Sequence, residues 1–323
     1  MNRSSFFKFY NKYGIFVLLG LVLAFFSIFA PNFFSVYNMI TILRQVSVLG
    51  TIVCALAIIL ISGGMDLSVG AQVAMGGVVT ARLLTETALP IPLVILIALL
   101  VGAALGMLNG FISLKLNIAP MIETLGMMLV LQGLALVVTG GYPVFGIPDK
   151  FKFIGQGYLF KTIPVPVVIF ILVVVVTQFI LKKTYFGRYI YAIGGNREAA
   201  HLAGININRL HIAIYTIGGL LTSIASLLLL GRVGSGQPTA GSSYAFDCMS
   251  GAVLGGISIR GGEGSVIGAV LGIVIIGILD NGMLLMGMDP NWQDVIKGAV
   301  LILAVGLDGL QSMEKARKNA AKK

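Results

Sequence analysis

Residues 91–113 read IPLVILIALLVGAALGMLNGFIS, a stretch that contains no charged side chain. A helix of about 20 apolar residues crosses a hydrocarbon core that is roughly 30 Å thick. Runs of the same kind recur along the chain, since 57% of its 323 residues are hydrophobic and only 11% are charged. A soluble domain carries about 25% charged residues. The sequence therefore predicts an all-α integral membrane protein in which residues 1–323 form a single transmembrane domain.

The apolar runs also predict how often the chain crosses the membrane. They cover residues 14–30, 45–62, 68–84, 91–113, 119–139, 164–181, 212–231, 244–259, 264–286 and 294–311. Strands of a membrane β-barrel would instead alternate apolar and polar residues over about ten positions. We therefore expect a bundle of about ten transmembrane helices.

The basic residues predict the orientation of this bundle. Lys and Arg are enriched in the cytoplasmic loops of membrane proteins. If the N-terminus is cytoplasmic, most of the 22 Lys and Arg residues fall on the inner side, including those of residues 182–211 and of the basic tail at residues 312–323. Both termini are therefore predicted to be cytoplasmic.

Residues 62–68, Ser-Gly-Gly-Met-Asp-Leu-Ser, leave the number of crossings open. We interpret them as a tight cytoplasmic turn between two helices. The alternative is a break in a helix at membrane depth. Non-helical backbone is tolerated there only where protein buries it or a watery cavity wets it, so such a break would point to a translocation path.

Two apolar runs resemble each other. Gly102-Ala-Ala-Leu-Gly106 is followed by Asn109-Gly110, and Gly268-Ala-Val-Leu-Gly272 is followed by Asn281-Gly282. The two runs lie five crossings apart and would have opposite orientations, as in transporters built from inverted repeats. An inverted five-plus-five repeat is one interpretation, and chance similarity is the other.

The longest predicted cytoplasmic segment covers residues 182–211. Within it the Asn196 side chain can cap a short helix. Glu198 then falls in the first turn, where the helix dipole favours a negative charge, and Gly204 occupies a position where helices commonly stop. The pattern predicts a helix of about two turns, which would be marginal alone in water.

This short helix presents small side chains that suit a groove on another protein: Ala199, Ala200, Leu202 and Ala203. One interpretation is therefore a docking element. The other is a helix that lies on the membrane surface, where Lys182, Lys183 and Arg188 would meet anionic lipid headgroups. Local chemistry supports both equally.

A family resemblance favours docking. Residues 187–205, GRYIYAIGGNREAAHLAGI, resemble the cytoplasmic coupling region in the permease subunits of ABC-type monosaccharide importers, the ribose, galactose and xylose group. Five further stretches resemble this family in the same order along the chain: GGMDLSVG at 63–70, LGMM at 125–128 with TGG at 139–141, QPTAG at 237–241, GGIS at 255–258 and GGEGS at 261–265.

The resemblance implies a homodimeric permease in a bacterial inner membrane, surrounded by lipid. It implies a cytoplasmic ABC ATPase and an extracytoplasmic sugar-binding protein as partners, with no role for nucleic acid. The ATPase, and not this chain, would bind ATP and Mg²⁺. The residues that the resemblance assigns to ATPase coupling are Gly195, Asn196, Glu198, Ala199, Ala200 and Gly204.

The chain departs from the family at Glu123, where an apolar residue is usual. We expect Glu123 to lie in the cytoplasmic headgroup region. The alternative is that it lines the inner mouth of the pathway.

The sequence contains no motif for ATP hydrolysis or for hydrolytic catalysis. It lacks the phosphate-binding pattern G-x-x-x-x-G-K-[ST], H-E-x-x-H and G-x-S-x-G. His201 and His211 have no ligand-like neighbours, so we expect neither a metal site nor a cofactor in this chain. The energy for transport must come from a partner or from a gradient.

Polar residues inside the apolar runs are candidates for the translocation pathway, because such groups are costly in a membrane. The candidates are Asp280, Asn281, Asp247, Gln132, Asn109 and Gln45. Hydrogen bonding between helices is the alternative role for each. A largely uncharged path suits a neutral monosaccharide. A proton-coupled or ion-coupled secondary transporter of a small polar solute is the competing hypothesis.

Overall fold

The computed structural model describes residues 3–320, which form 13 helices and a two-stranded hairpin. In chain order the elements are α1 (Arg3–Phe29), α2 (Val36–Ile61), α3 (Val69–Glu86), α4 (Ile91–Lys115), α5 (Pro120–Thr139), α6 (Asp149–Gln156), β1 (Tyr158–Leu159), β2 (Ile163–Pro164), α7 (Val165–Lys183), α8 (Tyr185–Gly195), α9 (Arg197–Leu202), α10 (Ile207–Val233), α11 (Tyr244–Leu254), α12 (Val266–Leu285) and α13 (Pro290–Ala320). The prediction of an all-α multi-pass membrane protein is confirmed.

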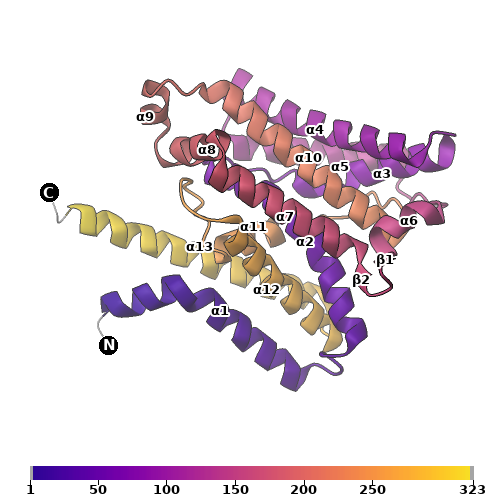
Figure 1. Ribbon diagram of the computed structural model, residues 1–323, viewed down its shortest axis with the longest axis horizontal. Helices are drawn as coiled ribbons and strands as arrows, with labels where there is room; N and C mark the ends of the chain where they lie inside the picture. The colour runs from indigo at the N-terminus through magenta and orange to yellow at the C-terminus, as the bar shows by residue number, and fades with distance from the viewer. Residues whose placement is uncertain (1–2, 321–323) are drawn as a thin grey trace.

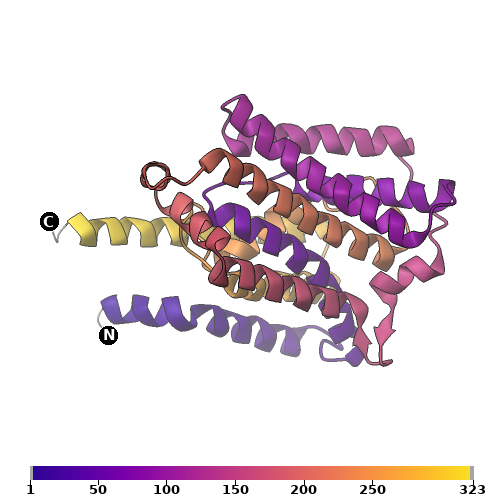
Figure 2. The ribbon, with the colours of Figure 1, turned by 45° about the horizontal axis from the view of Figure 1, so that its top comes forward.

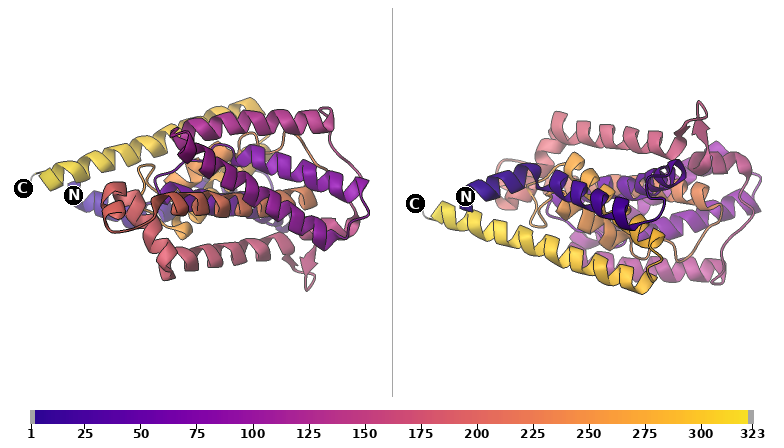
Figure 3. Two further views of the ribbon diagram at one scale, coloured as in Figure 1. Left: turned by 90° about the horizontal axis from the view of Figure 1, so that it is seen from above. Right: turned by 90° about the horizontal axis from the view of Figure 1, so that it is seen from below.

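The long helices run roughly along one direction (Figure 1). The start of α1, the end of α13 and the helices α8 and α9 lie together at one end of the bundle, and α6 and the antiparallel β1–β2 pair lie at the other. Figure 3 shows α7 on one long side of the bundle and α5 with α13 on the opposite side. This placement agrees with the prediction that both chain ends share a side with residues 182–211.

Six helices in the described part of the chain are long and apolar enough to cross a membrane: α2, α4, α5, α7, α10 and α12. The apolar part of α1, Gly14–Phe29, is shorter. Helix α11 has 11 residues, and at 1.5 Å per residue it extends for only about 16 Å, half of a hydrocarbon core. The number of ten crossings therefore remains a prediction, with α11 as an incomplete one.

Helix α2 forms the centre of the bundle. Its residues from Ile52 to Ile61 are 0–2% exposed, and α7, α10, α11 and α12 pack around it. A helix that is apolar on all sides is stable only where its surroundings are apolar on all sides too. Apolarity alone does not place α2 at the centre, because α4 is at least as apolar and mostly faces outward; the close contacts of α2 with its four neighbours do.

Helices α4 and α10 lie side by side (Figure 2). A Cβ atom on Gly106 would lie 2.1 Å from the carbonyl oxygen of Tyr215, so only glycine permits this approach. Small residues allow such contacts in membranes, where lipid is as apolar as the helices and close packing must hold them together.

For residues 62–68 the sequence predicts a tight cytoplasmic turn, with a helix break at membrane depth as the alternative. They connect α2 to α3 as a non-helical segment in which Asp66 is 2% exposed and Ser68 is 0% exposed. The segment is buried by the surrounding protein, as a break at membrane depth requires, and the choice between the two interpretations stays a prediction. Asp66 accepts hydrogen bonds from Ser68 within the segment and from Gln72 and Asn109 outside it, which is why the segment can be buried at all.

A second non-helical segment, residues 234–243, connects α10 to α11. It meets the start of α3, which directly follows the first segment: a Cβ atom on Gly70 would lie 2.0 Å from the carbonyl oxygen of Gly241. The starts of α3 and α11 therefore lie next to each other inside the bundle. The two irregular segments and the starts of α3 and α11 form one discontinuous region at the centre of the fold.

Candidate functional site

The helices α8 and α9 are defined by local caps. The Thr184 hydroxyl oxygen accepts a hydrogen bond from the Gly187 N–H at 3.2 Å at the start of α8, and Asn196 Oδ1 accepts one from the Ala199 N–H at 2.9 Å at the start of α9. Gly204, just beyond α9, has a φ of 84°. The cap and the stop lie where the sequence predicts them.

Helix α9 exposes one side and buries the other. Glu198 and Ala199 are exposed, and Leu202 is 82% exposed. Ala200, however, is 4% exposed and packs into the main core. The prediction that Ala200 belongs to the presented surface is therefore wrong, because a short helix held against a bundle must turn one side inward.

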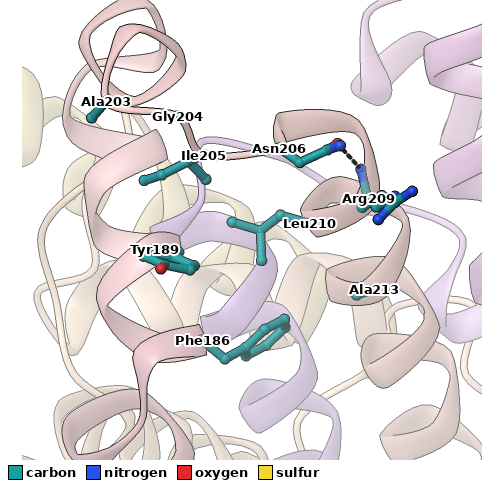
Figure 4. Close-up of a pocket in the computed structure, with 9 residues that line it drawn as sticks. All are labelled: Phe186, Tyr189, Ala203, Gly204, Ile205, Asn206, Arg209, Leu210 and Ala213. Atoms are coloured by element: carbon teal, nitrogen blue, oxygen red, sulfur yellow. Dashed lines mark hydrogen bonds between the residues drawn. The ribbon is translucent and has the colours of Figure 1, made fainter.

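A pocket of about 450 Å³ opens between α8, the α9–α10 connection and α10 (Figure 4). Its lining is mostly apolar, with Phe186 from α8 and Leu210 from α10 facing across it. Arg209, whose N–H donates to Asn206 Oδ1 at 3.0 Å, adds a positive charge to the lining. Ala203 and Gly204 belong to the lining, so the pocket begins directly after α9.

Helix α8 is attached to the connection between α11 and α12. The Tyr191 hydroxyl donates a hydrogen bond to the Gly264 carbonyl oxygen at 2.9 Å. Burial raises the pKa of the Tyr191 hydroxyl above its ordinary value. The hydroxyl is therefore protonated at neutral pH and keeps this donor.

The buried connection between α2 and α3 is organised around Asp66. Its carboxylate accepts hydrogen bonds from the Ser68 N–H at 2.8 Å and the Ser68 hydroxyl at 2.6 Å, and from the amides of Gln72 at 3.2 Å and Asn109 at 3.4 Å. A buried carboxylate is tolerated when donors surround it in this way. The network joins the irregular segment to α3 through Gln72 and to α4 through Asn109, which favours the helix-pairing role for Asn109 over the pathway role.

Glu123 lies in the first turn of α5 and is 7% exposed, which contradicts its predicted place among lipid headgroups. Both of its carboxyl oxygens are buried without a hydrogen-bond partner among the described residues. Its neighbour Thr124 accepts a hydrogen bond from the Leu67 N–H at 3.1 Å, so Glu123 lies beside the Asp66 segment. An unpaired buried carboxyl is costly, and it is the least satisfied group of this region.

A second charged cluster joins α11, α12 and α13. Lys297 Nζ lies 3.4 Å from Asp247 Oδ1, 3.6 Å from Asp280 Oδ1 and 3.3 Å from Asp294 Oδ1. The Ser243 hydroxyl donates to Asp247 Oδ2 at 2.8 Å. The structure thus brings together two predicted pathway residues, Asp247 and Asp280, through a lysine that the sequence analysis did not select.

Asn281 points to a different partner from its neighbour Asp280. Its amide and that of Asn38 in α2 exchange two hydrogen bonds, at 2.8 and 2.9 Å, and both side chains are buried. Asn38 also donates to the Phe33 carbonyl oxygen at 2.8 Å. This reciprocal pair supports the helix-pairing role over the pathway role for Asn281.

Replacing Asn281 with leucine should lower the free energy of unfolding by about 1–2 kcal/mol, because Asn38 loses both hydrogen bonds to Asn281 and its buried Oδ1 is left without this donor. The double variant with Asn38→Leu should regain part of this loss, since no unpaired amide remains. Denaturation in detergent micelles measures both effects. Unchanged stability with reduced solute uptake would instead assign Asn281 to the pathway.

The remaining candidates, Gln45 and Gln132, are half-buried and belong to neither cluster. The residues that sequence reasoning missed are Asn38, Ser68, Gln72 and Lys297. Lys297 carried a signal, since it is a basic residue inside an apolar run that also holds Asp294 one turn earlier. Its two other partners lie on different helices and leave no local pattern.

These features define a class of protein. Long apolar helices around a central helix, irregular backbone buried inside the bundle and polar clusters between helices are typical of membrane transport proteins. Residues 38–305 match the family described as "Branched-chain amino acid transport system / permease component". The chain belongs to this family and is an ABC transporter permease, a multi-pass protein of the bacterial inner membrane without ATPase activity of its own.

Curated relatives match over nearly the whole chain. The ribose import permease protein RbsC of Bacillus subtilis is 40% identical over 301 residues, which cover 93% of this chain and 92% of the relative. RbsC of Haemophilus influenzae is 40% identical over 304 residues, covering 93% and 94%. The galactose/methyl galactoside import permease protein MglC of Escherichia coli is 36% identical over 334 residues, covering 98% and 99%. No solved structure matches the chain.

Proposed function

We propose that this permease imports a ribose-like or galactose-like monosaccharide, using ATP hydrolysed by a separate ATPase subunit. The observation that carries the proposal is identity of 36–40% over at least 93% of the chain to permeases named for ribose and for galactose import. This membership also favours ATP-driven import over proton-coupled or ion-coupled transport. The sugar itself would be selected mainly by a separate binding protein.

The proposed ATPase site is the exposed face of α9 with the adjoining pocket. Glu198, Ala199 and Leu202 are exposed there, and the Asn196 cap holds the helix in a fixed conformation before a partner binds. Preorganisation of this kind lowers the entropic cost of association. In this arrangement the end that carries α8 and α9 is cytoplasmic, and the binding protein docks at the opposite end, near α6.

The proposed pathway uses the discontinuous region at the centre of the fold. A second copy of the chain would complete it, and the helices α1–α5, α7 and α10–α13 would make ten crossings, with α11 incomplete. The Asp247–Asp280–Lys297 cluster supplies polar groups on the side of the bundle formed by α11, α12 and α13. Movement of the irregular segments would expose the path alternately to the two sides of the membrane.

Reconstitution tests this proposal directly. The permease, its ATPase and its binding protein should together give uptake of labelled ribose or galactose into proteoliposomes that depends on hydrolysable ATP. A non-hydrolysable ATP analogue is the control. Uptake driven by a proton gradient without the ATPase would contradict the proposal.

The choice of solute has its own control. The family description also names branched-chain amino acids, so labelled leucine and valine are measured beside the sugars. ATP-dependent uptake of leucine but of neither sugar would show that the transported solute is an amino acid and not a monosaccharide. The proposal of ATP-driven import would then stand.

A further inference from the structure

Five glycines from three separate segments meet at the cytoplasmic end of the bundle, and we refer to them as the glycine junction. They are Gly63 of the α2–α3 connection, Gly194 and Gly195 at the end of α8, and Gly261 and Gly262 of the α11–α12 connection. The junction thus places the helix that precedes α9 against both connections that lead into the discontinuous region.

The contacts in the glycine junction are between backbones. The Gly262 N–H donates to the carbonyl oxygen of Ile61, the last residue of α2, at 2.8 Å. A Cβ atom on Gly194 would lie 1.9 Å from this same oxygen and 2.4 Å from the Gly262 nitrogen. A Cβ atom on Gly261 would lie 2.7 Å from the Cα of Gly63. No side chain fits between the three segments.

Backbone contact of this kind transmits displacement well. A flexible side chain between two segments absorbs a small shift by changing its rotamer, whereas close-packed backbone has low compressibility and passes the shift on. The Tyr191 hydroxyl adds a second link from α8, through the Gly264 carbonyl oxygen at 2.9 Å. A shift of α8 must therefore move the α2–α3 and α11–α12 connections, or break these contacts.

We infer that the glycine junction carries the movement of the bound ATPase from α8 and α9 to the two connections beside the pathway, with Gly194 and Tyr191 as positioning residues. The inference rests on the proposed ATPase docking at α9. It adds the route by which docking acts on the pathway: the α2–α3 connection leads to the Asp66 network, and the α11–α12 connection joins the two helices that carry Asp247 and Asp280.

The test measures coupling separately from assembly. The complete transporter is reconstituted with Gly194→Ala, and three quantities are recorded: copurification of the ATPase, ATP hydrolysis and uptake of labelled ribose or galactose. We expect the ATPase to copurify and to hydrolyse ATP, while uptake per ATP hydrolysed falls about tenfold. Gly20→Ala in α1 is the matched control, because a Cβ atom there meets nothing within 4 Å.

Tyr191→Phe provides a variant that preserves packing. It removes one hydrogen bond and adds no atom, so uptake per ATP should fall about threefold with assembly unchanged. Tyr185→Phe, at an exposed position of the same helix, is its control. If Gly194→Ala fails to fold, the ratio of uptake to ATP hydrolysis in Tyr191→Phe alone tests the inference.

The outcomes separate the inference from the proposed function. Normal ATPase copurification with a wild-type ratio of uptake to hydrolysis in Tyr191→Phe and in any folded Gly194→Ala would overturn the inference alone. Failure of the ATPase to copurify with the wild-type permease would overturn the proposed docking and the inference with it. A reduced ratio in the folded variants, with both controls unchanged, would support the junction.

Discussion

Replacing Lys297 with methionine is expected to lower the free energy of unfolding of this permease by about 3–5 kcal/mol, because removing one partner of a buried ion pair leaves an uncompensated charge. The Lys297 side chain is 15% exposed and lies among three carboxylates, of which Asp247 is 5% exposed and Asp280 14% exposed. Without Lys297 these two carboxylates would repel each other at the junction of α11, α12 and α13. Chemical denaturation in detergent micelles, with the yield of monodisperse protein, measures the loss.

Two further variants control this expectation. Asp294 is 72% exposed, so Asp294→Asn should change stability by less than about 1 kcal/mol. Adding Asp247→Asn and Asp280→Asn to Lys297→Met should recover much of the lost stability, since the buried charges are then removed together. A Lys297→Met protein as stable as the wild type would contradict the expectation and show that the carboxylates are protonated or solvated without Lys297.

Local features of this fold were predictable from the sequence. The apolar runs indicated the long helices because one physical requirement, covering a hydrocarbon core, sets both their length and their composition. Asn196 and Gly204 indicated the limits of α9 because capping depends on residues a few positions apart. In each case the signal and the structure lie in the same short stretch of chain.

Features that depend on distant residues were not predictable. Asn38 and Asn281 lie 243 residues apart in the chain and form one reciprocal amide pair. Residues 62–68 have the composition of an exposed turn, and only the donors from Gln72 and Asn109 show why they can be buried. The buried side of α9 was also not predictable, because a helix of six residues is too short for the spacing of its apolar residues to indicate which side faces the core.

Combining Glu198→Lys with Ala199→Trp is expected to weaken ATPase binding by about 100-fold and to abolish ATP-dependent uptake, while leaving membrane insertion intact. Both side chains are exposed on α9, so the substitutions change the proposed docking surface without entering the core. Disrupting the centre of an interface typically costs about 2–4 kcal/mol of binding free energy. Titration of the purified ATPase onto the permease in nanodiscs measures the affinity, and proteoliposomes measure the uptake.

Ala200→Trp separates docking from folding within the same helix. Ala200 is 4% exposed against the main core, so a large side chain there should cost about 1–3 kcal/mol of stability through overpacking. The exposed-face variant should unfold like the wild type and fail to bind the ATPase, whereas Ala200→Trp should unfold more easily. Wild-type ATPase affinity and uptake in the Glu198→Lys and Ala199→Trp double variant would place the docking surface elsewhere. In that case the other part of the proposed site, the pocket between α8 and α10, would be tested next by reversing the charge of Arg209.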